Sequence, residues 1–189
     1  MITDTRDVFF QKDPFKNHFL KKINFFIEDK KIQECKHNSR WIKKLYGKKI
    51  LKKLGDKYIS CSGTTIGYRN EMLMYLKCMI RHIERYKYFS FSNSPGTDQG
   101  NHNNIVYLTK FNKYKKYSNS DGYIATLANS DIKNFKLKNK LKNNKNIAYD
   151  IIHQYDRFFK KNNQNYSLEV KRYFSNLIKK LSLQTKVIS

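Results

Sequence analysis

Two aspartates near the start of the chain are the first side chains whose type and spacing suit a metal ion. Asp4 and Asp7 follow the strand-like pair Ile2-Thr3, and aromatic residues then lead to Asp13-Pro14. Mg²⁺ and Mn²⁺ prefer oxygen ligands and commonly take one or two carboxylates together with phosphate oxygens of a substrate. Aspartate is also common after strands because it forms turns. The pattern therefore leaves open either a metal site for a nucleotide-linked substrate or a capped turn.

Three later segments carry further polar side chains in close succession. Residues 62–67 include two glycines, so backbone amides could approach an anion there, although a plain strand-to-helix turn explains the segment equally well. The segment lacks the Gly-Lys-Ser/Thr element of a P-loop. Residues 98–103 combine a carboxylate, carboxamides and an imidazole, which suits a hydroxyl-rich ligand, unless Asp98 simply caps a helix. His153 follows an apolar run, where a histidine is either a metal ligand or a packing residue.

Strand-like and helix-like patterns alternate along the chain, which predicts an α/β fold. The apolar spacing of residues 69–86 indicates an amphipathic helix whose buried stripe is Met72, Leu76, Met79, Ile80 and Ile83. We expect a single domain over 1–189, with an exposed Lys/Asn-rich excursion at 133–146 and a C-terminal helix at 166–189. Strands are expected at 25–27, 58–61, 123–127 and 147–152, and further helices at 38–46, ending at Gly47, and from Asp98 to Leu108.

The composition is strongly basic, with 39 Lys+Arg against 15 Asp+Glu and a net charge of +24. Such a charge is typical of nucleic-acid-binding proteins, but lysine and asparagine are spread along the whole chain, which favours solvated surface positions. In either case the positive field attracts anionic ligands. The cysteines Cys35, Cys61 and Cys78 match no zinc or redox spacing, so a reducing compartment such as the cytoplasm is expected, with peripheral attachment to a membrane left open.

Taken in order, segments 3–15, 38–47, 61–67, 98–103 and 153–157 resemble the catalytic half of GT-A-fold glycosyltransferases. They most resemble a group of uncharacterised glycosyltransferase-like proteins of algae, large viruses and bacteria. The resemblance covers the chain from Ile2 to about Arg157. The Cys-Ser-Gly-Thr block at 61–64 and the His-Gln-Tyr-Asp-Arg block at 153–157 are its more specific parts. The Asp-Arg-Asp-like opening and the Asp-Gln block are shared more loosely among nucleotide-diphospho-sugar transferases.

The resemblance implies a divalent cation, Mn²⁺ or Mg²⁺, bound to the diphosphate of a sugar donor. Asp7 would be the last carboxylate of an Asp-x-Asp-type motif and His153 the second metal ligand. The spacing in this chain is Asp-x-x-Asp, so Asp4 would support either the ribose or the metal. Arg6 and Arg157 would add positive charge beside the diphosphate.

Other positions of the resemblance imply contacts with the sugar and its acceptor. Gly63 and Thr64 would line the donor-sugar pocket, and Asp98 and Gln99 would lie beside the sugar and acceptor, with Asp98 as the candidate base. The expected reaction transfers a sugar from a nucleoside diphosphate to a hydroxyl group of a glycan, lipid or protein.

The resemblance also implies a GT-A-like mixed sheet flanked by helices, which here lacks the family's N-terminal Rossmann-like half. We therefore expect either a truncated gene, a misplaced start codon or a second chain that supplies the nucleotide-binding half. Two other functions stay open at this point. One is a basic, non-catalytic nucleic-acid-binding protein whose tyrosines and phenylalanines stack on bases, and the other is an inactive pseudoenzyme.

Overall fold

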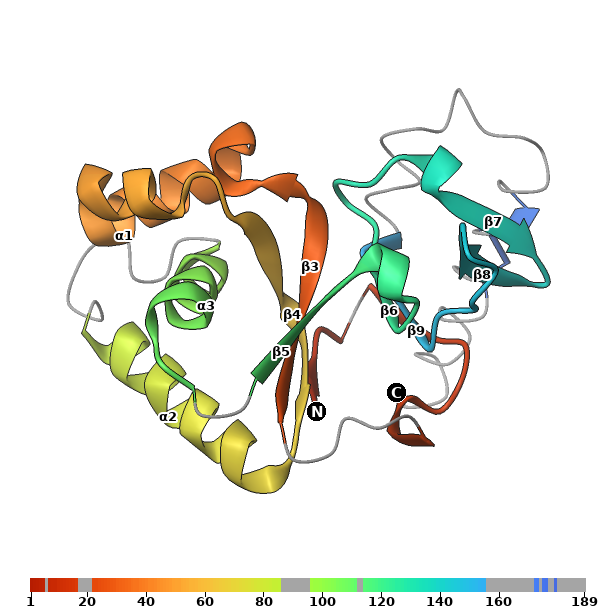
Figure 1. Cartoon of the computed structure of the whole chain (residues 1–189), viewed down its shortest axis with the longest axis horizontal. Coiled ribbons are helices and arrows are strands. Elements are labelled where there is room, and N and C mark those ends of the chain that lie inside the picture. Colours follow the sequence, from red (N-terminus) through yellow and green to blue (C-terminus); the bar gives the residue numbers. More distant parts are fainter. Residues whose placement is uncertain are drawn as a thin grey trace.

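The structure is a computed structural model that describes residues 1–5, 7–16, 22–85, 96–111, 114–155, 172–173, 175–176 and 179. The fold is α/β with mixed sheets: its three long α-helices lie between strands over residues 23–118, and strands with single 3₁₀ turns follow up to residue 153 (Figure 1). The α-helices are α1 (Lys36–Leu54), α2 (Arg69–Glu84) and α3 (Thr97–Leu108). Single turns of 3₁₀-helix occur at Pro14–Lys16, Ile32–Glu34, Asn119–Asp121 and Ile132–Asn134.

The larger sheet has the strand order β1-β4-β3-β5 and is mixed. Strand β4 pairs antiparallel with β1 on one side and with β3 on the other, whereas β5 runs parallel to β3. The strands are β1 (Ile2–Thr3), β3 (Ile23–Lys31), β4 (Tyr58–Gly67) and β5 (Tyr114–Ser118).

A smaller mixed sheet has the order β2-β9-β6, with β9 antiparallel to β2 and parallel to β6. Its strands are β2 (Val8–Phe10), β6 (Ile124–Thr126) and β9 (Ile151–His153). A separate hairpin joins β7 (Phe135–Lys138) to β8 (Lys140–Asn143). Figure 1 shows the helices on one side of the larger sheet and these strands on the other.

Strand β3 is apolar on both faces because the larger sheet is covered on both sides. Successive side chains of a strand point to opposite faces. Phe25 accordingly packs with Tyr75 of α2 and Ile105 of α3, whereas Phe26 packs with Tyr117 and with residues of the smaller sheet. The apolar run at 25–27 therefore belongs to a strand buried on both faces, and β3 extends well beyond the short strand expected from the sequence.

The helix expected at 69–86 is confirmed as α2 (Arg69–Glu84), but only part of the expected stripe, namely Met72 and the partly buried Met79, faces the core. Met72 and Tyr75 are buried, whereas Leu76, Ile80 and Ile83 are exposed. The buried pair lies against Phe25 and Phe111. Aromatic partners thus select the face of the helix that is buried, and the spacing of aliphatic residues alone does not identify it.

Residues 62–67 are not a loop, because β4 runs without a break to Gly67. The β-branched residues Thr64, Thr65 and Ile66 suit an extended backbone, and pairing with both β1 and β3 holds the segment in the sheet. The expectation of a small-residue loop was therefore wrong, and no loop amides are available there to bind an anion.

Helices α1 and α3 each differ at one end from the helices expected from the sequence. In α1 the first helical segment is interrupted at Gly47, as expected, by a non-helical backbone with a φ of 80°, and a second helical segment follows this kink and ends at the buried Leu54. Glycine accepts this φ without the penalty of a Cβ atom. Helix α3 begins at Thr97 with Gly96 as its N-cap, so Asp98 lies inside the first turn and does not cap it.

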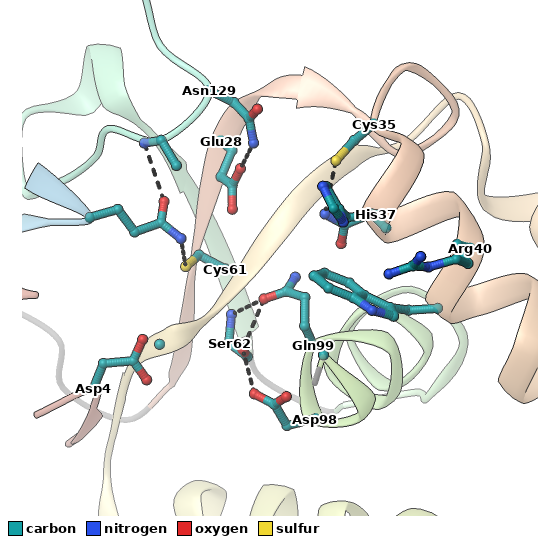
Figure 2. A pocket seen from close by; sticks show the side chains of 16 residues that line it. Asp4, Glu28, Cys35, His37, Arg40, Cys61, Ser62, Asp98, Gln99 and Asn129 are labelled. Atoms are coloured by element: carbon teal, nitrogen blue, oxygen red, sulfur yellow. Dashed lines mark hydrogen bonds between the residues drawn. The ribbon is translucent and has the colours of Figure 1, made fainter. Parts of the chain in front are cut away.

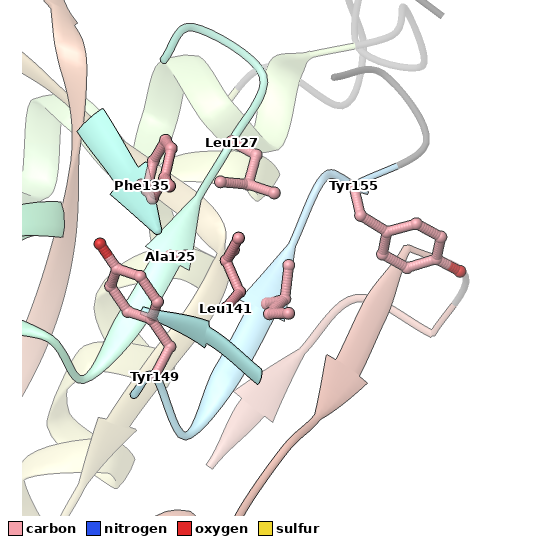
Figure 3. Packing of buried hydrophobic residues seen from close by; sticks show 7 residues of the cluster. Ala125, Leu127, Phe135, Leu141, Tyr149 and Tyr155 are labelled. Carbon is pink, nitrogen blue, oxygen red and sulfur yellow. The ribbon is translucent and has the colours of Figure 1, made fainter. Parts of the chain in front are cut away.

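The Lys/Asn-rich stretch 133–146 is not a simple exposed excursion. Its alternating pattern forms β7 and β8, which place Phe135 and Leu141 in a cluster with Tyr149 (Figure 3). Within these two strands lysines alternate with apolar residues. The apolar residues therefore share one face of the hairpin, which the overall Lys/Asn-rich composition does not reveal.

Most of the C-terminal helix expected at 166–189 lies outside the described residues, and those that are described, namely 172–173, 175–176 and 179, are helical. In the part of the chain that the structure covers, no helix has the length and apolar character needed to cross a membrane.

Candidate metal centre and adjoining pocket

Two aspartates from the start of the chain meet a histidine, His153, at the junction of the two sheets. His153 Nε2 lies 3.1 Å from Asp4 Oδ2 and 3.5 Å from Asp7 Oδ1. One ligand atom from each residue lies within 4.8 Å of the other two. This spacing allows the three side chains to bind one cation together.

Strand pairing positions these side chains. Asp4 follows β1 and its amide donates to Gly63 O at 2.9 Å, which ties it to β4. Asp7 precedes β2, whose Val8 lies opposite His153 in β9, and Asp7 O accepts from the Gln154 amide at 2.8 Å. The larger sheet therefore holds Asp4, and the smaller sheet holds Asp7 and His153.

Gly63 provides the space in which the cluster assembles. A Cβ atom at this position would overlap the Asp4 carboxylate and the His153 ring. Any larger residue at this point of β4 would therefore push the two side chains apart. Glycine is required at position 63 because the Asp4 and His153 side chains approach its backbone closely, and not because of its backbone angles.

Cys61 lies behind the His153 ring, on the side away from the carboxylates. Its sulfur is 3.3 Å from His153 Nδ1. Burial raises the pKa of the Cys61 thiol, and the contact with His153 offsets this only in part, so the group is a thiol and not an activated thiolate. A nucleophilic role for Cys61 is therefore disfavoured, and its position suits an acceptor for the Nδ1 proton.

The charge state of His153 depends on the same contacts. Burial lowers its pKa, but contacts with Cys61, Asp4 and Asp7 outweigh burial and raise the pKa well above 6.5. The carboxylates of Asp4 and Asp7 thus favour a proton at Nε2 of the metal-free ring. A cation bound by Asp4, Asp7 and Nε2 would take the place of that proton, and Nδ1 would then donate to Cys61 Sγ.

The donor set fits Mn²⁺ or Mg²⁺. Two carboxylates and one imidazole supply hard oxygen ligands and one nitrogen. The side chains of Asp7 and His153 are 3% and 0% exposed, whereas that of Asp4 is 48% exposed and lines an adjacent pocket. A cation held here would therefore be anchored on its inner side and reachable by a ligand from the pocket.

The pocket has a volume of about 640 Å³ and lies between β4, α1 and α3 (Figure 2). Gln99 Oε1 accepts from Ser62 N at 2.9 Å and from Ser62 Oγ at 2.8 Å, while its Nε2 donates to Ser60 O at 2.6 Å. Ser62 Oγ also lies 3.2 Å from Asp98 Oδ2. These contacts fasten α3 to β4, and they leave the exposed Asp98 carboxylate on the pocket wall.

Gly63 and Thr64 were both expected to line the donor-sugar pocket, but the structure places only one of them at the pocket. Gly63 lines the pocket, but Thr64 is fully buried and is not part of the pocket wall. Alternation along β4 puts Thr64 on the opposite face of the strand from Gly63. Arg6 and Arg157 lie outside the described residues.

The structure also places residues in the pocket for which the sequence indicated no role. Glu28, Trp41 and Asn129 line it, and they come from β3, α1 and the segment after β6. No local spacing links these positions, because tertiary packing alone brings them together. The only sequence signal was Trp41, which lies in one of the blocks that carry the glycosyltransferase resemblance.

No known family model, curated protein or solved structure matches this chain. The functional argument therefore depends on the geometry of the cluster and the pocket.

Proposed function

We propose that this protein is a metal-dependent glycosyltransferase that transfers a sugar from a nucleoside-diphosphate donor to a hydroxyl acceptor. The observation that carries the proposal is the convergence of Asp4 and Asp7 with His153, which is 149 positions from Asp4 in the sequence, at the edge of a pocket. If His153 lay on the far side of the molecule from Asp7, the two residues could not share a metal ion and the proposal would be ruled out. The two side chains instead lie 3.5 Å apart.

The ligand set suits the chemistry of a diphosphate leaving group. When bound, a divalent cation would neutralise the negative charge that develops on the departing diphosphate. Asp7 and His153 would hold it on the buried side, while the half-exposed Asp4 faces the pocket from which a donor would approach. The net charge of +24 on the protein would favour the approach of an anionic donor.

Asp98 is the proposed base for the acceptor hydroxyl. Its carboxylate is exposed at the pocket wall, in the first turn of α3, and Ser62 Oγ fixes its orientation. A general base must reach the proton that it accepts, and this carboxylate is open to a ligand in the pocket. Gln99, whose amide is occupied by β4, would act by positioning Asp98 and the pocket wall.

The mixed α/β architecture supports a GT-A-like assignment as part of the same proposal. Helices cover one face of the larger sheet, and the smaller sheet contributes His153 from a strand that follows the pocket wall in sequence. In this proposal the segment at 153–157 supplies the second metal ligand, as the resemblance of its sequence implies.

The proposal is tested by measuring the thermal stability of the protein with UDP- or GDP-linked sugars, with and without Mn²⁺, together with release of the nucleotide. We expect stabilisation and slow release only when Mn²⁺ and a donor are both present. Asp7→Asn should abolish both effects, whereas Asp56→Asn, at an exposed site outside the pocket, should retain them. Mn²⁺-independent stabilisation, or an unchanged response of Asp7→Asn, would contradict the proposal.

A further inference from the structure

The end of the pocket farther from Asp4 has an aromatic wall. Trp41 of α1 lines it and is partly buried. One part of the indole packs so closely on Gly96 that a Cβ atom there would overlap the ring, and His37 lies beside it with ring centroids 5.7 Å apart. The indole thus lies between Gly96 and His37 and presents an apolar surface to the pocket.

The same pocket also contains a buried carboxylate, that of Glu28. Glu28, near the end of β3, is only 4% exposed and lines the same pocket. The Asn129 amide donates to Glu28 Oε2. A buried carboxylate is costly unless it is hydrogen-bonded, and at a pocket wall it is well suited to accept hydrogen bonds from ligand hydroxyl groups.

Asn38 adds a second polar group at this end of the pocket. It is 5% exposed, and its Nδ2 donates to Cys35 Sγ at 3.4 Å. Among the described residues, no donor reaches its buried Oδ1. Buried polar atoms without a partner are rare in proteins, so this one is a sign that a hydrogen-bond donor or water completes the site.

The pocket has two parts, one next to the metal cluster at Asp4 and one next to Trp41. Figure 2 shows Asp4 on one side of the pocket and His37 and Arg40 on the other, with Glu28 and Gln99 between them. A donor diphosphate held by the Asp4 cluster would place its own sugar next to that cluster. The end that contains Trp41 would then be available to the acceptor.

The chemistry of this end favours a neutral sugar ring. A pyranose has C–H groups on one face, which stack on an indole, and hydroxyl groups around its edge, which donate to carboxylate and amide oxygens. The negative charge of Glu28 disfavours a phosphate or carboxylate at the same position. An acyl chain would leave the buried Asn38 Oδ1 without a donor.

We infer that the part of the pocket between Trp41, Glu28 and Asn38 binds a neutral sugar ring of the acceptor, stacked on Trp41 and hydrogen-bonded to Glu28. The word acceptor in this inference rests on the proposed glycosyltransferase function, whereas binding of the ring does not. The acceptor is accordingly a carbohydrate and not a lipid or a protein side chain.

Trp41 makes the test direct, because it is the only tryptophan in the chain. Its fluorescence is followed while metal-free protein is titrated with methyl glycosides of glucose, galactose and mannose, and with sorbitol as an acyclic control. At least one glycoside should cause a saturable change in the millimolar range, and sorbitol should cause none. Asp7→Asn should respond like the wild type, because this binding needs no cation.

Variants of the two wall residues make the inference specific. Glu28→Gln retains an oxygen for Asn129 and should weaken glycoside binding by about tenfold or more, since hydrogen bonds to charged groups contribute more than neutral ones. Trp41→Phe should also weaken glycoside binding, whereas Asp56→Asn should not. Because Trp41→Phe removes the fluorescent residue, its binding is measured by saturation-transfer NMR. The two variants are independent, so a failure of one to fold leaves the other as the test.

The outcomes separate this inference from the proposed function. An absence of glycoside binding, or binding by Glu28→Gln and Trp41→Phe as tight as that of the wild type, would overturn the inference even if metal-dependent donor turnover were found. A Trp41 response only to Mn²⁺ with a UDP-sugar would assign the ring to the donor and would also overturn it. Metal-independent glycoside binding without any donor response would support the sugar site and contradict the proposed transferase function.

Discussion

At the scale of single residues, His153 is held from two sides. Its Nε2 faces Asp4 and Asp7, and its Nδ1 faces the sulfur of Cys61. A metal-binding histidine commonly donates its other ring proton to a neighbouring acceptor, which fixes the tautomer and the orientation of the ring. Cys61 is the residue placed to do this in the present cluster, although a thiol is a weak acceptor.

The role of Cys61 as a positioning residue predicts a graded effect of substitution. Cys61→Ala should weaken Mn²⁺ binding by about tenfold or more, whereas Cys61→Ser, which retains an acceptor, should lose much less. Calorimetric titration with Mn²⁺ measures both. Cys78→Ala is the matched control, because Cys78 is also free but lies on α2 outside the pocket. Equal affinity of Cys61→Ala and wild type would exclude the positioning role.

Gly63 predicts a steric effect on the same site. In Gly63→Ala the added methyl group would overlap the Asp4 carboxylate and the His153 ring, so the two ligands should separate. We expect loss of Mn²⁺ binding with a folded protein, as judged by circular dichroism. Ser62→Ala, the adjacent change on β4, removes only hydrogen bonds to α3 and should retain the cation. Wild-type Mn²⁺ affinity in Gly63→Ala would show that the ligands do not need this close approach.

The sequence allowed part of this site to be predicted. Asp4, Asp7, Gly63, Asp98 and His153 were identified through the resemblance of their segments to glycosyltransferases, and the structure brings them to one pocket and its edge. Glu28 and Asn129 could not be identified this way. They lie 101 positions apart, and their meeting depends on how the segment after β6 packs on β3.

At the scale of secondary structure elements, α3 is joined to the larger sheet by polar side chains. Asn101, His102 and Asn103 are fully buried in this helix. Asn103 Oδ1 accepts from Ser60 N at 2.9 Å, and the His102 ring lies between Ser60 Oγ at 2.9 Å and the Tyr75 hydroxyl at 2.7 Å. Such directional bonds fix the register of α3 on β4, and thus the position of Asp98.

His102 predicts a pH dependence of stability. Burial lowers its pKa from 6.5 to about 3, so the folded protein keeps the ring neutral while the unfolded chain protonates it. The unfolded state therefore binds more protons between pH 6.5 and 3, and the free energy of unfolding should fall by several kcal/mol as pH decreases through that window. Above pH 6.5 this contribution is fully present.

Chemical denaturation of wild type and His102→Gln at a series of pH values measures this contribution. The variant cannot titrate at position 102, so the difference in unfolding free energy between the two proteins should shrink as pH falls from 6.5 towards 3. Other titrating groups act equally in both proteins and cancel. A difference that does not change with pH would contradict neutral burial of His102.

Elements with strong periodicity could be predicted, and those that depend on partners could not. Helix α2 was recognised from its spacing, but its buried face is set by Phe25 and Phe111. Strand β4 was expected to stop at Cys61, because Ser62-Gly63-Thr64 has the composition of a loop. It continues because strands on both sides supply hydrogen bonds, a long-range effect that local composition does not contain.

At the scale of the whole molecule, an acidic site lies in a basic protein. The chain has a net charge of +24 and only 15 acidic residues, yet Asp4, Asp7, Glu28 and Asp98 all lie at or beside the pocket. The general positive field favours the approach of anions, whereas the local carboxylates favour a cation. A ligand that consists of a diphosphate together with a divalent cation suits both.

The same net charge predicts weak binding to nucleic acids that is unrelated to the pocket. Association with a single-stranded oligonucleotide should be independent of sequence and should weaken steeply as salt is raised, because it depends on neutralising phosphates. Asp7→Asn should bind as the wild type does. Fluorescence anisotropy across a salt series measures this, and tight, sequence-specific binding at high salt would favour a nucleic-acid-binding function over the proposed one.

The central claim is that Asp4, Asp7 and His153 bind one divalent cation together, and Mn²⁺ titration followed by electron paramagnetic resonance tests it most directly. Wild type and Asp56→Asn should each remove one equivalent of free Mn²⁺ from solution. Asp7→Asn and His153→Ala should each lose that site while remaining folded. Undiminished binding of Mn²⁺ by these two variants, or no binding by the wild type, would contradict the account.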